Sequence, residues 1–129
     1  MITALLLLAA APAAADEDCG DLPQQPMNQC FYRAYERADA EMNAQWKRTA
    51  AAMKQSDRDL DRTYDKEPGY FDTLLAGQRA WLTYRDQQCL SESFEARGGS
   101  MSPMLNSTCR ITLTQERTRQ LKALVEVEN

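Results

Sequence analysis

The sequence predicts an all-α protein, a small antiparallel bundle of three to four helices stapled by two disulfides. Three observations lead to this prediction. Apolar residues recur at spacings of three, four and seven along three long segments, which is the period of an amphipathic helix. No segment shows the alternation of apolar and polar residues that marks a half-buried strand. The chain has four cysteines, and an even number in an exported protein indicates disulfides.

The first 15 residues have the pattern of a secretory signal peptide. They are apolar from the fourth residue onward and interrupted by one proline, and the run is too short to cross a bilayer, which takes ~20 apolar residues. Three alanines precede Asp16, where charge begins abruptly, so we expect cleavage near Ala15 and a single domain over residues 16–129. Acidic residues directly before Cys19 are incompatible with a lipoprotein signal, so we expect no membrane anchor.

An acidic lead-in over residues 16–26, with two prolines, is expected to be irregular. From Met27 the helical period begins, and its apolar face combines Tyr35, Met42, Trp46, Ala50 and Met53. The stretch 57–67 is dense in alternating charge and poor in apolar residues, which predicts a solvated helical extension.

Pro68-Gly69 breaks the pattern, and a second helix is expected from about Tyr70 to Ala96. Its apolar stripe consists of Leu74, Leu75, Trp81, Leu82 and Cys89. Gly98-Gly99-Ser100 then ends it. A last helix is expected over roughly 103–127, with an apolar side made of Met104, Leu105, Cys109, Leu113, Leu121 and Leu124. Short connections make neighbouring helices antiparallel.

This arrangement gathers the cysteines at one end of the bundle. Cys30 begins the first helix, Cys89 lies near the end of the second, Cys109 lies near the start of the third, and Cys19 is in the lead-in. Four cysteines allow three pairings; we favour Cys89–Cys109 across the glycine pair and Cys19–Cys30 holding the lead-in. A zinc site is the alternative, but no two cysteines have the C-x₂-C spacing and the chain has no histidine. We expect no metal.

Five polar residues fall on or beside the apolar stripes: Asp39, Asn43, Gln78, Arg85 and Arg117. A buried charge without a partner is costly. We therefore expect Asp39 to accept hydrogen bonds from Arg85 or Arg117, with Asn43 and Gln78 completing a structural network. The alternative is a catalytic or ligand-binding cleft built on Asp39 and the two arginines. Such a cleft would hold one carboxylate and would lack the acid pair of a glycosidase.

Composition narrows the function further. Without histidine the chain cannot form a Ser-His-Asp triad or a Cys-His pair, and we expect neither an enzyme nor a cofactor. The net charge of −4 disfavours nucleic acid and suits a basic protein partner. Two tight turns present aromatic or methionine side chains, and their candidate contact residues are Tyr70, Phe71, Ser100 and Met101.

Several motifs occur in order along the chain after residue 26. They are Met27-Asn28-Gln29-Cys30, Ala38-Asp39-Ala40-Glu41-Met42-Asn43, Gln78-Arg79-Ala80-Trp81-Leu82-Thr83-Tyr84-Arg85-Asp86, Gly98-Gly99-Ser100, Pro103-Met104, and Leu113-Thr114 followed by Arg117. Together they resemble the LprI-like lysozyme inhibitor family of secreted bacterial proteins. The charged stretch 57–67 is longer than the family pattern.

The resemblance implies a secreted or periplasmic helical domain and, for at least part of the family, binding and inhibition of host lysozyme. An acidic, rigid body suits the capture of a strongly basic enzyme such as lysozyme or a related muramidase. The alternative is a periplasmic interaction protein, in immunity or envelope stress, whose partner is not a lysozyme.

Overall fold

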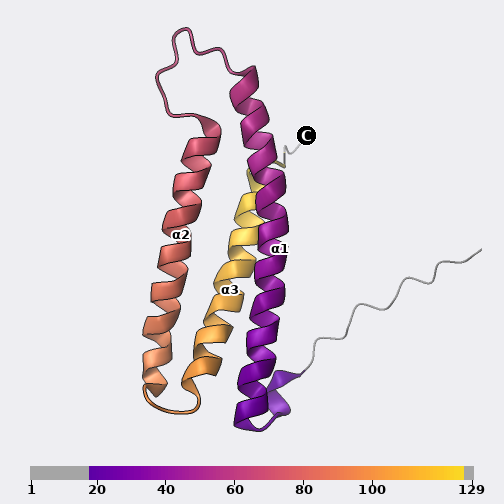
Figure 1. The fold of residues 1–129 in the computed structure, drawn as a ribbon, viewed down its shortest axis with the longest axis vertical. Coiled ribbons are helices and arrows are strands. Elements are labelled where there is room, and N and C mark those ends of the chain that lie inside the picture. Colours follow the sequence, from indigo (N-terminus) through magenta and orange to yellow (C-terminus); the bar gives the residue numbers. More distant parts are fainter. Residues whose placement is uncertain (1–17, 127–129) are drawn as a thin grey trace, which may run out of the picture.

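The computed structural model describes residues 18–126, which form three long α-helices and two short 3-10 helices (Figure 1). In chain order the elements are η1 (Cys19–Asp21), α1 (Gln24–Asp59), α2 (Tyr70–Ser93), η2 (Phe94–Ala96) and α3 (Ser102–Ala123). α2 runs antiparallel to the other two helices. The predicted all-α bundle is therefore confirmed. The predicted signal peptide, residues 1–15, lies outside the described residues.

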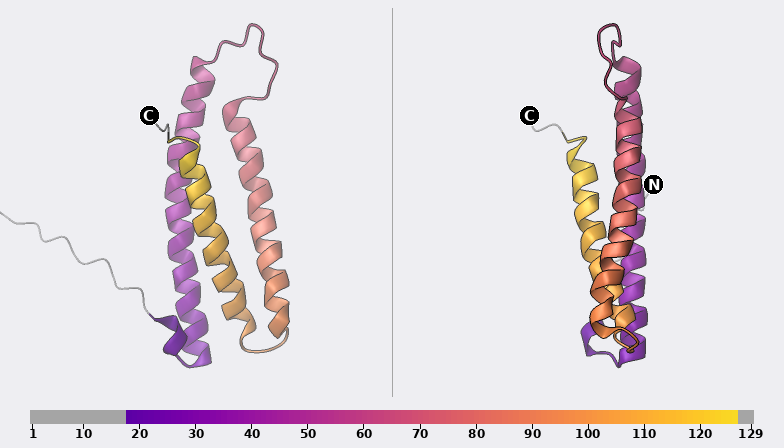
Figure 2. Two further views of the ribbon diagram at one scale, coloured as in Figure 1. Left: turned by 180° about the vertical axis from the view of Figure 1, so that it is seen from behind. Right: turned by 90° about the vertical axis from the view of Figure 1, so that its left-hand side faces the viewer.

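The helices differ in length, and this gives the bundle two unlike ends. α1 has 36 residues and α3 has 22, which corresponds to about 54 Å and about 33 Å. The hydroxyl of Thr49 donates to the carbonyl of Leu121 at 2.9 Å, so α3 ends level with the last third of α1. The last turns of α1, the start of α2 and the loop between them therefore project beyond α3 (Figures 1 and 2).

The apolar core is small and lies between the three helices. Met42 and Ala50 of α1, Leu74 of α2 and Leu121 of α3 are its buried members. Around them pack Trp46, Met53, Phe71, Trp81 and Leu82. The predicted apolar sides of the first two helices thus supply the core. Leu124 was wrongly placed on the apolar side of the last helix: α3 ends at Ala123, and Leu124 is 54% exposed.

The helix bounds correct the sequence prediction in several places. α1 begins at Gln24 rather than Met27, because Pro26 lies in the first turn, where a helical N–H has no intrahelical acceptor to lose. The lead-in contains the 3-10 turn η1. The last helix stops short of the predicted residue 127. Gly98, after η2, has φ +77°, a left-handed conformation that glycine adopts without a steric penalty.

The predicted helical extension over 57–67 is wrong beyond Asp59, since residues 60–69 form a loop. Aspartate side chains account for this. The Asp61 carboxylate accepts from the backbone N–H of Thr63 at 2.9 Å, and the Asp65 carboxylate accepts from that of Glu67 at 2.8 Å. Such local bonds satisfy the backbone without a helical ladder.

Asp57 joins the two helices that flank this loop. Its carboxylate oxygens accept from the backbone N–H groups of Tyr70, at 2.7 Å, and Phe71, at 3.0 Å. These are the first two amides of α2, which have no acceptor within their own helix. Gly69 lies against this carboxylate, because a Cβ there would stand 3.1 Å from Asp57 Oδ1. The side chain of one helix thus caps the next.

We expect Asp57→Ala to lower the free energy of unfolding by about 1 kcal/mol, since it leaves two helix amides without their acceptor. Urea denaturation of the purified protein measures this. Asp59→Ala is the matched control: Asp59 is exposed and accepts from Gln55 one turn earlier, so its loss should change stability by less than about 0.5 kcal/mol. Equal losses in the two variants would contradict the capping role.

Candidate functional site

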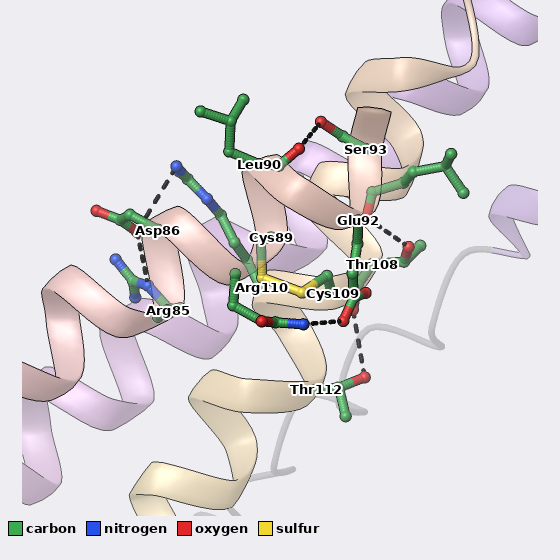
Figure 3. The surroundings of a disulfide bond; sticks show 12 residues. Arg85, Asp86, Cys89, Leu90, Glu92, Ser93, Thr108, Cys109, Arg110 and Thr112 are labelled. Carbon is green, nitrogen blue, oxygen red and sulfur yellow. Dashed lines mark hydrogen bonds and ion pairs between the residues drawn. A yellow bond between two sulfur atoms is a disulfide. The ribbon is translucent and has the colours of Figure 1, made fainter. Parts of the chain in front are cut away.

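Two disulfides close the end of the bundle opposite the projecting loop. Cys19 pairs with Cys30, which ties η1 to α1, and Cys89 pairs with Cys109, which ties α2 to α3. The pairing favoured from the sequence is confirmed. Cys89 has no exposed surface, and it lies among polar side chains of α2 and α3 (Figure 3). Two connections, η1 to α1 and α2 to α3, are thereby fixed at one end, while the other end is held by noncovalent contacts.

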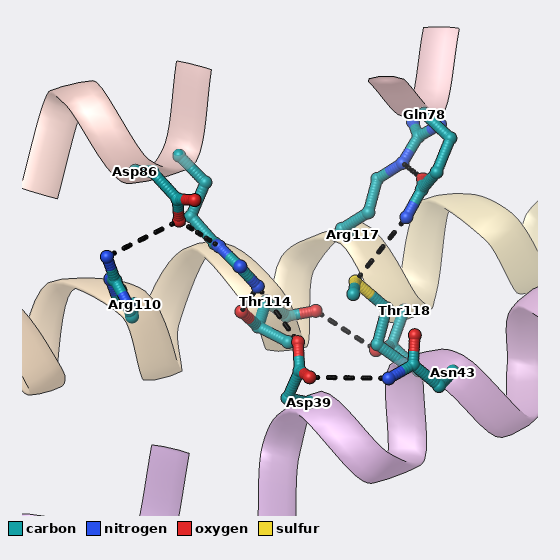
Figure 4. A network of polar contacts seen from close by, with 10 residues as sticks. Asp39, Asn43, Gln78, Asp86, Arg110, Thr114, Arg117 and Thr118 are labelled. Carbon is teal, nitrogen blue, oxygen red and sulfur yellow. Dashed lines mark hydrogen bonds and ion pairs between the residues drawn. The ribbon is translucent and has the colours of Figure 1, made fainter. Parts of the chain in front are cut away.

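Arg85 of α2 lies at the centre of a buried polar cluster, and it is 5% exposed. Its Nη1 donates to Asp39 Oδ1 of α1 at 2.9 Å and to Thr114 Oγ1 of α3 at 3.2 Å. Its Nε donates to Asp86 Oδ1 at 3.0 Å. Asn43 adds a bond to the second oxygen of Asp39 at 3.3 Å (Figure 4). One guanidinium therefore connects all three helices.

Aromatic rings enclose the same guanidinium. The Cζ atom of Arg85 lies 5.3 Å from the ring centre of Tyr35 and 5.2 Å from that of Trp81. Burial alone would lower the pKa of Arg85, but the hydrogen bonds to Asp39 and Asp86 raise it above its ordinary value. Arg85 is consequently a fixed positive charge at any physiological pH.

Arg110 of α3 flanks the cluster on the side of the disulfide. It lies 3.6 Å from Asp86 Oδ1 and its Cζ stands 5.3 Å from the Tyr35 ring. Its buried Nε has no hydrogen-bond partner within residues 18–126. Tyr35 thus has the cations of two helices against its ring, which favours a cation–π contribution from each.

Gln78 and Arg117 form a second cluster. Arg117 Nε donates to Gln78 Oε1 at 2.8 Å, and the Gln78 amide nitrogen approaches Met42 Sδ at 3.8 Å. The Cζ atom of Arg117 lies 5.9 Å from the Trp81 ring, and burial lowers its pKa. The five predicted polar residues therefore fall into two clusters (Figure 4). The ring of Trp81 lies close to the guanidinium of each cluster. Asp39 is bound by Arg85, and Arg117 binds Gln78 instead.

The sequence prediction missed Thr114 and Asp86. Thr114 has no exposed surface and accepts from Arg85; its position seven residues before Leu121, on the same helix face, was the available signal. Asp86 bridges Arg85 and Arg110, and its place next to Arg85 in the sequence gave no indication that it would turn toward it.

The carboxylate that could act chemically in the Arg85 cluster is already engaged. This carboxylate, Asp39, accepts from Arg85 and Asn43. Within the part of the chain that the structure describes, no three Cys, Asp or Glu side chains gather where they could hold a metal ion. Charges from all three helices meet here and pair with one another.

The candidate contact turns lie at opposite ends of α2, about 36 Å apart for its 24 residues. At the loop end Tyr70 is 47% exposed, whereas Phe71 is half-buried beneath Lys54, whose Nζ is 4.5 Å from the ring centre. At the disulfide end Met101 is 43% exposed, and the carbonyl of Ser100 accepts from Asn28 Nδ2 at 2.8 Å. The four residues do not form one surface.

Both ends carry an open surface hollow. One of about 490 Å³ lies at the disulfide end between α1 and α3 and includes Tyr32 and Pro103. One of about 370 Å³ lies at the loop end and includes Met53, Tyr70 and Leu124. No helix between residues 18 and 126 combines the length and the apolar character needed to cross a membrane.

Comparison with known proteins gives two matches. The family described as lysozyme inhibitor LprI matches residues 16–121. An uncharacterized protein of Rhizobium meliloti (strain 1021) is 44% identical over 126 residues, which cover 95% of this chain and 91% of that protein. No solved structure matches the chain significantly.

Proposed function

The chain belongs to the lysozyme inhibitor LprI family, and on this premise we propose that it is a secreted or periplasmic protein that inhibits lysozyme, or a related muramidase, by occluding its active site. The match to the family over residues 16–121 is the observation that carries the proposal. It covers the helical bundle from η1 to Leu121 in α3. The proposed localisation assumes removal of residues 1–15 as a signal peptide.

Charge and rigidity support this function. The chain has a net charge of −4, and an acidic protein is attracted to a strongly basic enzyme at long range, which raises the association rate. The two disulfides fit a protein that works outside the cytoplasm. They also keep the free protein close to one shape, so less conformational entropy is lost on binding.

The bonding of the buried charged side chains supports a protein that binds without catalysing. The buried charges of Arg85 and Asp39 are used in bonds between helices, and Arg117 is bound to Gln78. A catalytic group must instead be in reach of substrate with a lone pair or proton to spare. We propose that the enzyme in the complex is the partner and that this chain blocks it.

We expect the exported chain, residues 16–129, to slow lysozyme-catalysed clearing of a peptidoglycan suspension in a dose-dependent way, with half-inhibition at micromolar concentration or below. Because opposite charges steer the association, inhibition should weaken as salt rises from about 0.05 M to 0.3 M. The same chain, reduced and alkylated, is the control and should inhibit less.

Several lysozymes of different type should be assayed in parallel. No effect of micromolar protein on any of them would contradict the proposed function. It would favour the alternative of an immunity or envelope-stress protein with another partner, which a pull-down from periplasmic extract could then recover at stoichiometric yield.

A further inference from the structure

The loop end of the bundle is narrow and prominent. Residues 60–69 connect α1 to α2 beyond the end of α3, so only two helices support them (Figures 1 and 2). The disulfide end is broader, because η1, α1, α2 and α3 all meet there. A narrow projection can enter the cleft of another protein, whereas a broad end can only cover it.

The loop is ordered by its own side chains. Asp61 Oδ1 accepts from both the backbone N–H and the hydroxyl of Thr63, at 2.9 and 2.6 Å. These bonds, the hydroxyl first, lower the pKa of Asp61. Asp65 holds the next turn through Glu67, and Asp57 fixes the point where the chain enters α2. A loop ordered before binding loses less conformational entropy when it binds.

Tyr64 lies between these two turns and is 95% exposed, more than any other large hydrophobic side chain that the structure describes. Tyrosine is enriched among the residues that dominate protein interfaces, because its ring offers apolar area and its hydroxyl a hydrogen bond. Arg62 and Lys66, two residues to either side, are exposed cations. The tip therefore presents one aromatic ring with a cation two residues to either side, alternating with acidic residues of which Asp61 and Asp65 are already bonded to backbone N–H groups.

We propose that this tip, formed by Arg62, Tyr64 and Lys66, is the inhibitory element and enters the substrate cleft of the lysozyme, an inference that rests on the proposed function. A glycosidase of this kind holds two carboxyl groups on either side of the scissile bond. The exposed side chains of Arg62 and Lys66 can pair with those carboxyl groups, whereas the carboxylates of Asp61 and Asp65 are turned to the loop's own backbone. The ring of Tyr64 takes a place where a sugar ring of the substrate would lie.

Tyr64→Ala tests whether the ring of Tyr64 contributes to inhibition. We expect it to raise the concentration for half-inhibition of lysis at least about thirtyfold, the effect of removing a dominant interface side chain. Tyr84→Ala is the matched control, since Tyr84 is 55% exposed on the flank of α2 and should leave inhibition unchanged. Met101→Ala removes the exposed methionine at the disulfide end and should also have no effect. Tyr64 is almost fully exposed, so the thermal unfolding of Tyr64→Ala should match that of the parent.

Arg62→Glu tests the charge, with Arg79→Glu on α2 as control. Both variants add the same negative charge to the protein, so long-range attraction to a basic enzyme changes equally. If the Arg62 side chain meets cleft carboxyl groups, Arg62→Glu should weaken inhibition about tenfold or more, whereas Arg79→Glu should not. A short oligomer of N-acetylglucosamine, which binds in the lysozyme cleft, should compete with the parent chain for lysozyme.

The outcomes separate the inference from the function on which it rests. Inhibition by the parent that is lost in Tyr64→Ala and displaced by the oligomer supports both. Inhibition that is equal in the parent and Tyr64→Ala, or lost in Met101→Ala, overturns the inference and leaves the lysozyme-inhibitor function standing. Absence of inhibition by the parent overturns both.

Discussion

Replacing Cys89 and Cys109 together by alanine is expected to lower the free energy of unfolding by about 3 kcal/mol. The bond closes a loop whose ends are 20 residues apart, and opening a loop of this length gives the unfolded chain about that much additional entropy. The loss is large for this fold, because the core has few fully buried apolar side chains and small domains are only marginally stable. Guanidinium denaturation of the oxidised proteins measures the change.

The pair Cys19 and Cys30 offers the control. Its separation of 11 residues predicts a similar effect on the unfolded chain. However, this bond ties η1 to the start of α1 and does not join two long helices. When it is removed, η1 can detach while the bundle stays folded, and the native state recovers part of the entropy. We therefore expect a smaller loss than for Cys89 and Cys109; the opposite order would contradict this assignment of the two bonds.

The cysteine positions and the helical period were enough to predict this end of the molecule. Cys89 and Cys109 flank a glycine pair between two amphipathic segments, so closing that turn brings them together. The loop after α1 could not be predicted in the same way. Alternating charge over 57–67 suits an exposed helix as well as a loop, and the bonds from Asp61 and Asp65 to the backbone that decide between them leave no periodic signal. Tyr64, the only aromatic residue in that charged stretch, was the available hint.

The sequence named five members of the polar network and left Asp39 to pair with Arg85 or Arg117; the structure selects Arg85 and adds Thr114 and Asp86. Helical periodicity shows which face a residue occupies, but not how far one helix is shifted along another. Thr114 lies level with Asp39, because Arg85 bonds both. Arg117 lies three residues, about 4.5 Å, further along α3, where it meets Gln78. A shift of α3 by about one turn would instead bring Arg117 to the level of Asp39. Packing of the core sets that shift, and the sequence of a single helix does not contain it.

Arg85→Ala is expected to lower the free energy of unfolding by about 3 kcal/mol. It removes the cation that Asp39 and Asp86 share, and it leaves a gap between the rings of Tyr35 and Trp81. Removing one member of a buried pair costs about 3–5 kcal/mol. The lower end of this range applies here. The Asp39 and Asp86 side chains are 31% and 44% exposed, so water solvates the carboxylates that remain.

Arg85→Met separates the contribution of packing from that of charge. The unbranched methionine side chain fills the space between the rings of Tyr35 and Trp81 but carries no positive charge. We expect it to recover the packing part of the loss, about 1 kcal/mol relative to Arg85→Ala, while the loss of the cation shared by Asp39 and Asp86 remains. The folded-state pKa of Arg85 is raised above its unfolded value, so its stabilising contribution is complete at every pH below that unfolded value, and is lost only as pH rises through the higher folded value, far above the physiological range. The destabilisation should therefore not vary with arginine ionisation between pH 6 and 9. If folded Arg85→Met still inhibits lysozyme, the cluster serves the fold; lost inhibition in that folded variant would identify it as part of a ligand site.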